Sequence, residues 1–449
     1  MQTLKVGYSK INITPPMGIG IMGYFIPRQA DGVLDHLEAV AVAVNHGDTT
    51  ALLVTVDNCG IIQEVSKYYR EYITEKTGVP GENIFIQATH THTGPFVALD
   101  SKDELISRYS EDLKYKLADV CAFALADLKP AKMGIANSKA DKISFIRRYR
   151  MKDGSAQTNP GLNNPDVVAP IGNIDNTVGV IRFDRKNATS IVMIHFANHP
   201  DSIGGNKISA DWPGLTRRIF KNAVDNTECI VFNGAQGDVN HINPNPKDGD
   251  LNGMKVDFDG VVRGYQHAIH LGRVLTGSAM QVYDKVEYVD VDKISCVQKV
   301  ISLASNMPDD DEKLKVAHEY VQLHNSGRDD LIPYKDMMLT TVVAESLRMV
   351  RLENGPKEFT MPLSMIVIGE VAIFGIPGEP FTEVGRMMRE DSGYKMVWSC
   401  CDANGKEGYF PTMDAYLEGG YEARTSNFKA GVAETIVQQG KNILKGIKG

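Results

Sequence analysis

The sequence predicts an α/β fold in which a mixed sheet has flanking helices and a helical insertion. Short apolar runs rich in β-branched residues alternate with longer stretches of helical periodicity, which is the pattern of α/β proteins. The chain has 449 residues, of which 43% are hydrophobic and 23% charged, so it has ample apolar material for a packed core. These proportions exclude a disordered or fibrous protein.

The first clear unit is a strand, a helix and a second strand. Residues 50–56 and 83–86 are short apolar runs, and residues 63–77 between them form an amphipathic stretch. The right-handed crossover rule makes two strands connected in this way parallel neighbours. The second strand leads directly into His90.

Later segments extend the same pattern. A long helix is expected over residues 102–128, and the Gly-, Pro-, Asn- and Asp-rich residues 153–176 predict a long loop of the kind that is often functional. Further strands are expected at residues 178–183, 191–196, 230–232, 371–374 and 396–399, and helices at residues 213–223 and 261–280. Most of these strands end at a segment that contains His, Asp, Glu or Tyr.

A helical insertion is expected late in the chain. Residues 285–303 have the composition of strands, and residues 310–350 have that of two helices separated at Asn325-Ser326-Gly327. The sequence contains no internal repeat, low-complexity tract or Pro-rich linker. We therefore expect one domain over residues 1–449, with a helical insertion at about 304–355.

The net charge and the first residues of the chain bear on its binding partners and its location. The formal net charge of -8 argues against nucleic acid, whose phosphates need a basic surface. The first residues have neither the pattern of a signal peptide nor a transmembrane segment, so we expect a cytoplasmic protein. The sequence leaves the oligomeric state open.

The cysteines do not form a recognisable metal motif. Six are scattered along the chain, without a Cys-x-x-Cys spacing or a disulfide framework. We expect free, mostly buried thiols. Any metal would then be held by His, carboxylate or phenolate groups.

The strongest chemical signal is the segment Thr89-His90-Thr91-His92, which directly follows a predicted strand. Ligands bind at strand ends in α/β folds, and imidazole is a common zinc ligand. A His-x-His pattern alone is more often structural. It needs a further histidine or a carboxylate to complete a metal site.

Two other strand ends supply such groups. His199 lies in Asn198-His199-Pro200 and Glu379 in Pro377-Gly378-Glu379, and each segment follows an apolar run. Read singly, these residues are more typical of a loop histidine and of a charge at a helix N-terminus. Together the three strand ends predict a metal site at the carboxyl ends of the strands.

Several common catalytic motifs are absent or misplaced. Gly18, Gly20 and Gly23 fit a dinucleotide-binding fingerprint, but no strand precedes them and Pro27 follows where a helix would begin, so we interpret the segment as a turn. The sequence has no Gly-x-Ser-x-Gly elbow, no His-Glu-x-x-His and no P-loop. Serine hydrolases of that type, zincins and P-loop enzymes are excluded.

The chain resembles, from end to end, the catalytic domain of the neutral/alkaline non-lysosomal ceramidases. The matching segments are, in order, Asn12-Ile13-Thr14-Pro15-Pro16, Thr89-His90-Thr91-His92-Thr93-Gly94-Pro95, Asn198-His199-Pro200, Asp211-Trp212-Pro213-Gly214, Gly237-Asp238-Val239, Pro377-Gly378-Glu379 and residues 409–423. The resemblance covers the catalytic domain and not the C-terminal immunoglobulin-like domain of larger family members.

The resemblance implies a set of site residues. Zinc would be held by His90, His199, Glu379 and Tyr409, while His92 and Tyr421 would face the scissile amide. Arg147 matches the family's active-site arginine, although the adjacent Arg148 leaves the register open by one residue. The chain departs from the family at Asn240, where the ceramidases have a serine, and we expect Asn240 to donate a hydrogen bond.

These residues predict a zinc-dependent hydrolase of an acyl bond. The resemblance implies a role in lipid and sphingolipid metabolism, in which zinc-activated water hydrolyses the amide of an N-acylsphingosine-like substrate. His92 and Tyr421 would move protons or stabilise the oxyanion together with Arg147. One alternative is a cytoplasmic metallohydrolase of a small polar amide, ester or lactone. Another, from a different class, is a zinc-holding binding protein without turnover.

Overall fold

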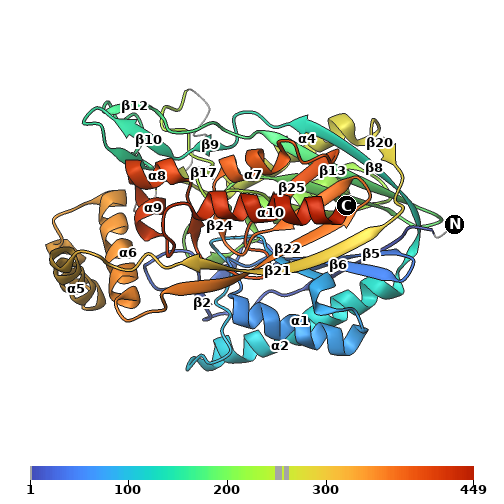
Figure 1. Ribbon diagram of the computed structural model, residues 1–449, viewed down its shortest axis with the longest axis horizontal. Helices are drawn as coiled ribbons and strands as arrows, with labels where there is room; N and C mark the ends of the chain where they lie inside the picture. Colours follow the sequence, from blue (N-terminus) through green and yellow to red (C-terminus); the bar gives the residue numbers. More distant parts are fainter. Residues whose placement is uncertain (1–2, 248–254, 257–261, 449) are drawn as a thin grey trace.

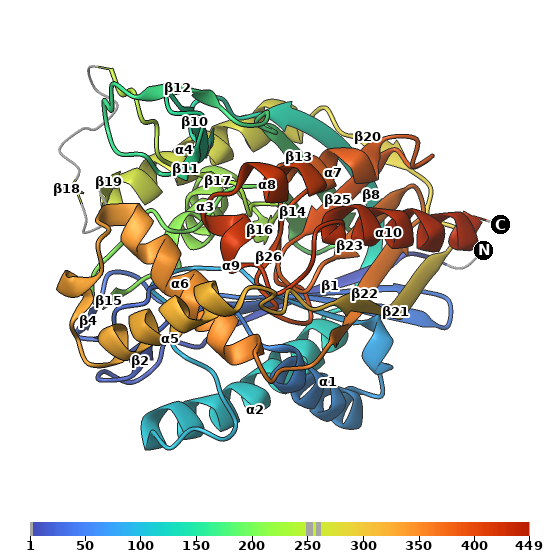
Figure 2. The same ribbon diagram turned by 60° about the vertical axis from the view of Figure 1, so that its left-hand side comes forward.

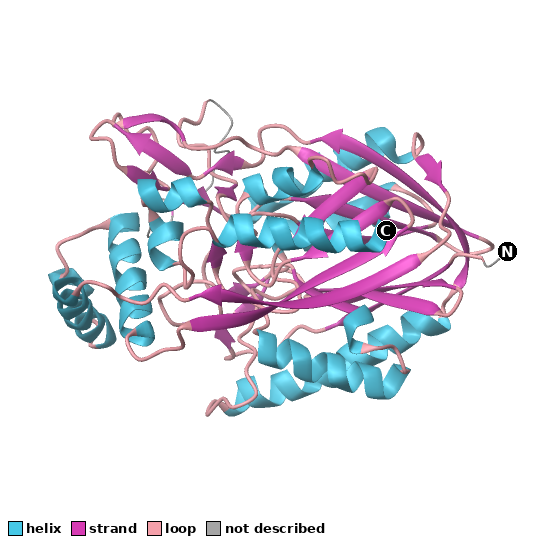
Figure 3. Cartoon of the chain, viewed as in Figure 1, coloured by secondary structure: helices cyan, strands magenta, loops and turns pink. Residues whose placement is uncertain are grey.

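Two β-sheets form the centre of the molecule in the computed structural model, which describes residues 3–247, 255–256 and 262–448 (Figure 3). Within these residues the nine-stranded sheet has the order β16-β14-β13-β8-β1-β5-β6-β7, with β20 paired to β8. Its strands are β1 (Lys5–Asn12), β5 (Glu38–His46), β6 (Thr49–Val56), β7 (Ile84–Ala88), β8 (Lys129–Lys139), β13 (Thr177–Arg185), β14 (Ser190–Phe196), β16 (Thr227–Asn233) and β20 (Glu287–Val289). The second sheet contains β21 (Ile294–Ala304), β22 (Glu358–Ile368), β23 (Val371–Gly375) and β25 (Met396–Cys400).

Apolar residues cover both faces of the large sheet. In β5, Ala41 packs in a cluster with α1 and α2, whereas the next residue, Val42, packs in the cluster between the sheets. Successive side chains of a strand point to opposite faces, so a strand buried on both sides must be apolar at every position. The continuous apolar runs of the sequence follow from this.

The large sheet splays where β1 meets β8. Only Lys5 and Val6 of β1 pair with β8, whereas β1 pairs with β5 along its whole length. Residues from both halves of this sheet and from the four-stranded sheet therefore share one central core, to which Val42, Phe183 and Ile373 belong. This arrangement brings the ends of strands from both halves of the large sheet and from the four-stranded sheet close together.

Helices cover the outer faces of the sheets (Figure 1). Helices α1 (Gln63–Thr77) and α2 (Glu104–Ala126) pack on the half of the large sheet that contains β5 and β6. Helices α3 (Asp211–Ala223) and α4 (Tyr265–Tyr283) pack on the half that contains β13 and β14. Helices α7 (Thr382–Arg389) and α10 (Val432–Lys448) cover the four-stranded sheet.

The insertion between β21 and β22 is a helical pair at one end of the molecule (Figures 1 and 2). Helices α5 (Asp311–Asn325) and α6 (Asp336–Leu352) enclose a small apolar cluster of their own, centred on Ile332, Val342 and Val343. Helix α6 is tied to α9 (Tyr421–Thr425) by an ion pair between Arg424 and Glu345. The Nε of Arg348 also donates to the Arg424 carbonyl at 3.0 Å.

Short elements complete the chain around the site. They are β2 (Gly20–Ile21), β3 (Arg28–Gln29), β4 (Gly32–Val33), β9 (Phe145–Ile146), β10 (Arg148–Met151), β11 (Ala156–Thr158), β12 (Val167–Pro170), β15 (Lys207–Ile208), β17 (Val239–Asn240), β18 (Lys255–Val256), β19 (Val262–Arg263), β24 (Glu379–Pro380), β26 (Tyr409–Phe410), α8 (Met413–Glu418) and the 3-10 turns η1 (Gly81–Asn83) and η2 (Asp329–Leu331). None of the described helices has the length and apolar character needed to cross a membrane.

The predicted fold class is confirmed, including the mixed sheet, the flanking helices and the helical insertion. Strands β6 and β7 are parallel, as the crossover rule requires. All six cysteines are free, and five of them are buried.

Three details of the predicted elements differ. The loop expected over residues 153–176 contains β11 and β12, which pair with β10; they are short and lack the apolar alternation that marks a strand. The second sheet, and strands such as β5 and β22, were not predicted. Helix α4 begins at Tyr265, and its predicted start at Val261 lies outside the described residues.

Candidate metal centre and active site

His90 occupies a strained position directly beyond β7. Its φ of 73° lies in the left-handed region, which few residues other than glycine adopt. The backbone N–H of His90 donates to the Asn58 carbonyl at 2.8 Å, and its Nδ1 lies 2.5 Å from an Asp402 carboxylate oxygen. A carboxylate on Nδ1 fixes the tautomer and orients Nε2 as a metal ligand.

Three buried side chains direct ligand atoms at one point. The Nε2 atoms of His90 and His199 are 3.2 Å apart, and Oε2 of Glu379 lies 3.3 Å from the first and 3.6 Å from the second. Ligands about 2.0–2.1 Å from a tetrahedral zinc ion lie about 3.3 Å from one another. The three atoms therefore have the spacing of one face of a tetrahedral zinc site, and we call them the ligand triangle.

The strand pairing brings Tyr409 next to Glu379. Strands β24 and β26 are parallel, with Glu379 opposite Tyr409, and the Glu379 N–H donates to the Gly408 carbonyl at 2.8 Å. Burial and the Glu379 carboxylate raise the pKa of the Tyr409 hydroxyl well above its usual value, while the Arg147 guanidinium opposes the shift. A metal cation at the ligand triangle would favour the phenolate, since metal ligands bind in their deprotonated form.

The charges around the ligand triangle favour a cation. Burial alone would lower the pKa of His90, but the Glu379 and Asp402 carboxylates hold it well above the usual value. Burial alone would raise the pKa of Glu379, whereas His90, Lys406 and Arg147 bring it to about 2. A divalent cation at the ligand triangle would add to these positive partners of the buried carboxylates.

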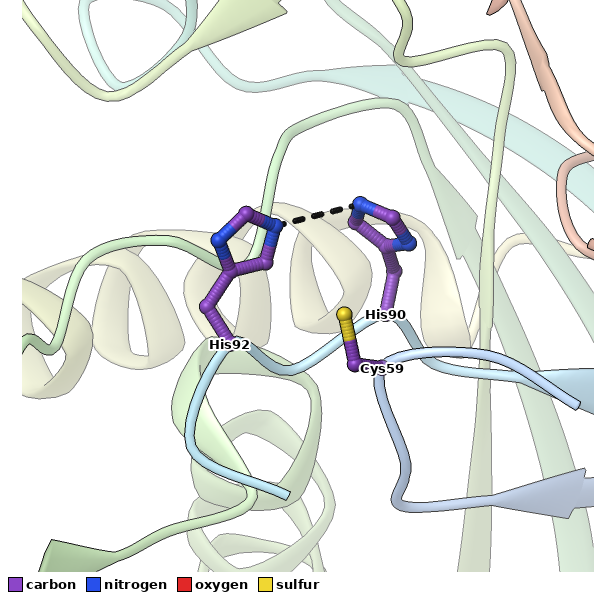
Figure 4. Close-up of side chains that lie close together, drawn as sticks. All are labelled: Cys59, His90 and His92. Carbon is purple, nitrogen blue, oxygen red and sulfur yellow. Dashed lines mark hydrogen bonds between the residues drawn. The ribbon is translucent and has the colours of Figure 1, made fainter. Parts of the chain in front are cut away.

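Cys59 belongs to a second group that could hold a metal. Its sulfur points toward the rings of His90 and His92 (Figure 4), and the three residues have ligand atoms within 4.8 Å of one another. Lys406 Nζ donates to the Cys59 Sγ at 3.4 Å, so this sulfur already has a cationic partner. The two histidines and the glutamate of the ligand triangle match the ligands of hydrolytic zinc sites better than this group does. The sequence did not predict that Cys59 lies beside the histidines.

His92 lies beside the ligand triangle. Its Nε2 is 3.2 Å from Nε2 of His90, and its Nδ1 is 3.7 Å from an Asp201 carboxylate oxygen. Burial lowers the pKa of His92 well below its usual value, although Asp201 opposes the shift. A side chain at Gly23 would place its Cβ 2.8 Å from the His92 ring, so the glycine motif that resembles a dinucleotide fingerprint serves this close approach.

The two adjacent arginines have different environments. Arg147 lies over the Tyr409 ring, with its guanidinium carbon 5.4 Å from the ring centroid, and its Nε donates to Glu422 at 2.7 Å. Arg148 instead donates to the Gly419 carbonyl and lies over the Phe381 ring. Arg147 is therefore the arginine that faces the candidate site.

Tyr421 lines the pocket, whereas Asn240 lies beneath its wall. The Tyr421 ring is 5.6 Å from the Tyr409 ring and lines the pocket beside the ligand triangle. Asn240 is fully buried, and its Nδ2 donates to Asn159 Oδ1 at 2.8 Å. Asn159 lines the pocket and Asn240 does not. Asn240 therefore lies behind Asn159 and is linked to the pocket through this hydrogen bond.

The segment that contains Gly237 and Asp238 packs against the Glu379 strand. The Gly237 N–H donates to the Pro380 carbonyl at 2.8 Å, and a Cβ at Gly237 would come within 2.5 Å of the Glu379 carbonyl oxygen. Asp238 accepts a 2.7 Å hydrogen bond from the N–H of Thr382, the first residue of α7. Both residues thus fix the backbone that carries Glu379.

One pocket connects this centre with the helical insertion. Its empty space, including open solvent at the mouth, is about 890 Å³. His92, His199, Arg147, Tyr409 and Tyr421 lie at its inner end. Phe25 and Ile26 give it an apolar side. The helical insertion forms the part of the lining that we call the roof, which has polar and apolar side chains: His324, Asp329, Asp336, Met337, Leu339 and Val343.

Sequence reasoning missed three residues that organise the site. Asp402 lies two residues beyond the end of β25, so a carboxylate beyond a predicted strand was an available signal. Gln87 is fully buried, and its amide nitrogen donates to the carbonyls of Asn233 at 2.6 Å and Cys401 at 2.8 Å, which links the ends of β7, β16 and β25. Asn159 lies among many polar residues, and nothing in the sequence distinguishes it.

Comparisons with known proteins show which solved structures have a similar fold. No family model and no curated protein matches the chain. Among solved structures, a neutral ceramidase from Pseudomonas aeruginosa matches with a TM-score of 0.74 and 16% sequence identity, covering 100% of this chain and 75% of that one. A ceramidase complexed with C2 matches with a TM-score of 0.71 and 16% identity, covering 100% of this chain and 76% of the other. The chain therefore has a neutral ceramidase-like fold.

Proposed function

We propose that this protein is a zinc-dependent hydrolase of an acyl bond, with ceramide-like N-acyl amides as its first candidate substrates. The observation that carries the proposal is the ligand triangle of His90, His199 and Glu379, with donor atoms 3.2–3.6 Å apart. The ceramidase-like fold supports a hydrolase of this kind. The cytoplasmic location and the role in sphingolipid metabolism stay predictions.

In this proposal zinc is held by His90, His199, Glu379 and Tyr409. Their donor set of two imidazoles and two oxygen ligands suits zinc, which binds nitrogen and oxygen ligands and can expand from four to five ligands, so that water or an acyl oxygen could still bind. When bound, zinc would polarise an acyl carbonyl and lower the pKa of water from about 16 to about 7.

The remaining side chains have roles that follow from their surroundings. Burial lowers the pKa of His92, which favours the neutral ring, and the Asp201 carboxylate 3.7 Å away would stabilise the cation that forms when the ring accepts a proton. The Tyr421 hydroxyl can donate to a developing oxyanion, and Arg147 adds positive charge. Asn240 acts by holding Asn159 at the edge of the pocket.

A small polar amide, ester or lactone is the second candidate substrate. The pocket wall contains charged side chains, including Arg263, Asp329 and Asp336, beside its apolar side. A site for two long hydrocarbon chains would be lined mainly by apolar groups, whereas a lining that mixes apolar and charged side chains suits a polar acyl compound.

Metal analysis coupled to a substrate panel tests the proposal. We expect about one zinc ion per purified chain, and loss of both zinc and turnover in His90→Ala. The control is His318→Ala, because His318 is an exposed histidine that pairs with Glu353 and lies outside the pocket. The panel contains ceramides, short N-acyl amines, esters and lactones.

Each result of this experiment has a distinct meaning. Absence of zinc from the wild-type protein would contradict the metal site. Zinc without turnover of any acyl compound would favour a zinc-holding binding protein, and turnover of polar compounds alone would remove ceramide.

A further inference from the structure

The roof of the pocket carries a His–Asp pair with no part in the proposed metal chemistry. His324 lies in the last turn of α5, and its Nδ1 is 3.0 and 3.1 Å from the two carboxylate oxygens of Asp329. Both residues line the pocket that also contains His92, Arg147 and Tyr421. The pair therefore faces the same space as the candidate catalytic groups.

The pairing defines what the other ring nitrogen can do. An ionised carboxylate only accepts hydrogen bonds, so the Nδ1 of His324 must carry the hydrogen. In the neutral ring Nε2 is then an acceptor. The side-chain hydrogen bonds of His324 to the described residues all use Nδ1, and the side chain keeps 20% of its surface exposed, so Nε2 is available to a ligand.

The end of α5 does not depend on this pair. The backbone N–H of Ser326 donates to the Gln322 and Leu323 carbonyls, and the N–H of Gly327 donates to the His324 carbonyl at 3.0 Å. The Arg328 N–H donates to the Leu323 carbonyl at 2.9 Å. These bonds close the turn through the main chain, and the His324 side chain is not needed to hold it.

We propose that His324 is a specificity-determining residue that accepts a hydrogen bond from a hydroxyl or amine of the substrate, with Asp329 fixing the ring tautomer. The inference rests on the proposed function, because it takes this pocket as the substrate site. It deepens that function by naming the substrate class: acyl compounds that carry a hydrogen-bond donor on the part that reaches the roof. The apolar side at Phe25 and Ile26 would receive the hydrocarbon part of the same molecule.

A matched pair of amides tests this assignment. N-octanoylethanolamine and N-octanoylpropylamine have nearly the same size, and only the first carries a hydroxyl. We expect the wild-type protein to favour the hydroxylated amide about tenfold or more in kcat/KM, since the analogue without the hydroxyl would leave a polar group of the pocket unpaired. His324→Leu should reduce this ratio to about 1, mainly through KM.

Three further variants separate recognition from structure. His324→Gln retains an acceptor and should recover part of the preference, and Asp329→Asn should weaken it because the tautomer is no longer fixed. His318→Leu breaks a comparable pair, with His318 Nε2 3.0 Å from Glu353, on an exposed surface outside the pocket. It should keep the wild-type ratio. Melting temperatures verify that all variants fold.

A binding measurement distinguishes failure of the inference from failure of the proposed function. Calorimetric Kd values for the two amides in metal-free protein report the preference without turnover. A preference in Kd that His324→Leu removes, together with no hydrolysis of any compound of the substrate panel by the zinc-loaded protein, would support recognition by His324 and overturn the proposed function. Hydrolysis with equal preference in wild type and His324→Leu, or no preference in either measurement, would overturn the inference.

Discussion

The ligand triangle and the roof of the pocket are built in opposite ways. The triangle takes two side chains from the segments that follow β7 and β14 and the third from β24, all of them buried and held by further partners. The roof comes from one helical pair between β21 and β22, which has its own small apolar cluster. His324 and Asp329 in the roof are partly exposed.

This difference separates the chemistry of the site from its selectivity. A group held by strands of two sheets can move only if the central core rearranges, so its geometry is tied to the fold. A helical pair with its own cluster can change its pocket-facing residues without disturbing that core. A ceramidase-like fold at 16% identity is therefore compatible with a different substrate.

Apart from loss of a metal ligand, the largest effect is expected when Tyr421 or Arg147, which line the pocket beside the ligand triangle, is substituted. Tyr421→Phe and Arg147→Lys should each lower kcat about 10²–10³-fold while zinc content stays the same, because each removes a group that would stabilise transition-state charge. Steady-state kinetics with metal analysis measures both quantities. Arg148→Lys, which changes the neighbouring arginine over Phe381, is the control. A fall in zinc content parallel to activity would show that these residues support the metal instead.

A smaller effect follows from making the same substitution in both regions. Asp402→Asn should weaken zinc binding about 10–100-fold, because it removes the carboxylate that orients His90. Asp329→Asn removes the carboxylate that pairs with His324 and should leave zinc affinity unchanged. Competition with a chelator gives both affinities. Equal losses in the two variants would mean that the roof and the ligand triangle are coupled.

The sequence could predict the parts of the site that depend on strand ends. His90, His199 and Glu379 each follow an apolar run, and the structure brings them together. Asp402 also follows a predicted strand, but an aspartate beyond a strand is too common to single out. The position of Arg147 relative to Arg148 needed coordinates, since Arg147 falls in the short gap between β9 and β10.

The roof could not be predicted as part of the site. The helical periodicity of residues 310–350 shows that α5 and α6 exist, but their position over the pocket depends on contacts with α9, about 75 residues later in the chain. Because these partners are far apart in the sequence, a local sequence pattern cannot predict their contact. Gln87 was missed for a similar reason, because its two carbonyl partners, Asn233 and Cys401, are distant in sequence.

The last prediction concerns stability, and it rests on a buried histidine in the large sheet. His195 of β14 is buried, stacks on Trp398 and has its Nε2 3.2 Å from the Ser399 carbonyl oxygen. Burial lowers the pKa of His195 to about 4. The unfolded chain binds a proton at this histidine below about pH 6.5 and the folded chain does not, so stability present at neutral pH is lost as pH falls toward 4.

We therefore expect His195 to contribute about 2 kcal/mol to the loss of unfolding free energy between pH 7 and pH 5. His195→Gln should make the decline shallower by about that amount, whatever the substitution costs at pH 7. Urea denaturation at the two pH values measures this difference. An unchanged decline in His195→Gln would mean that β14 admits the charged ring, and the contrast between a rigid scaffold and an adaptable roof would then lose its thermodynamic support.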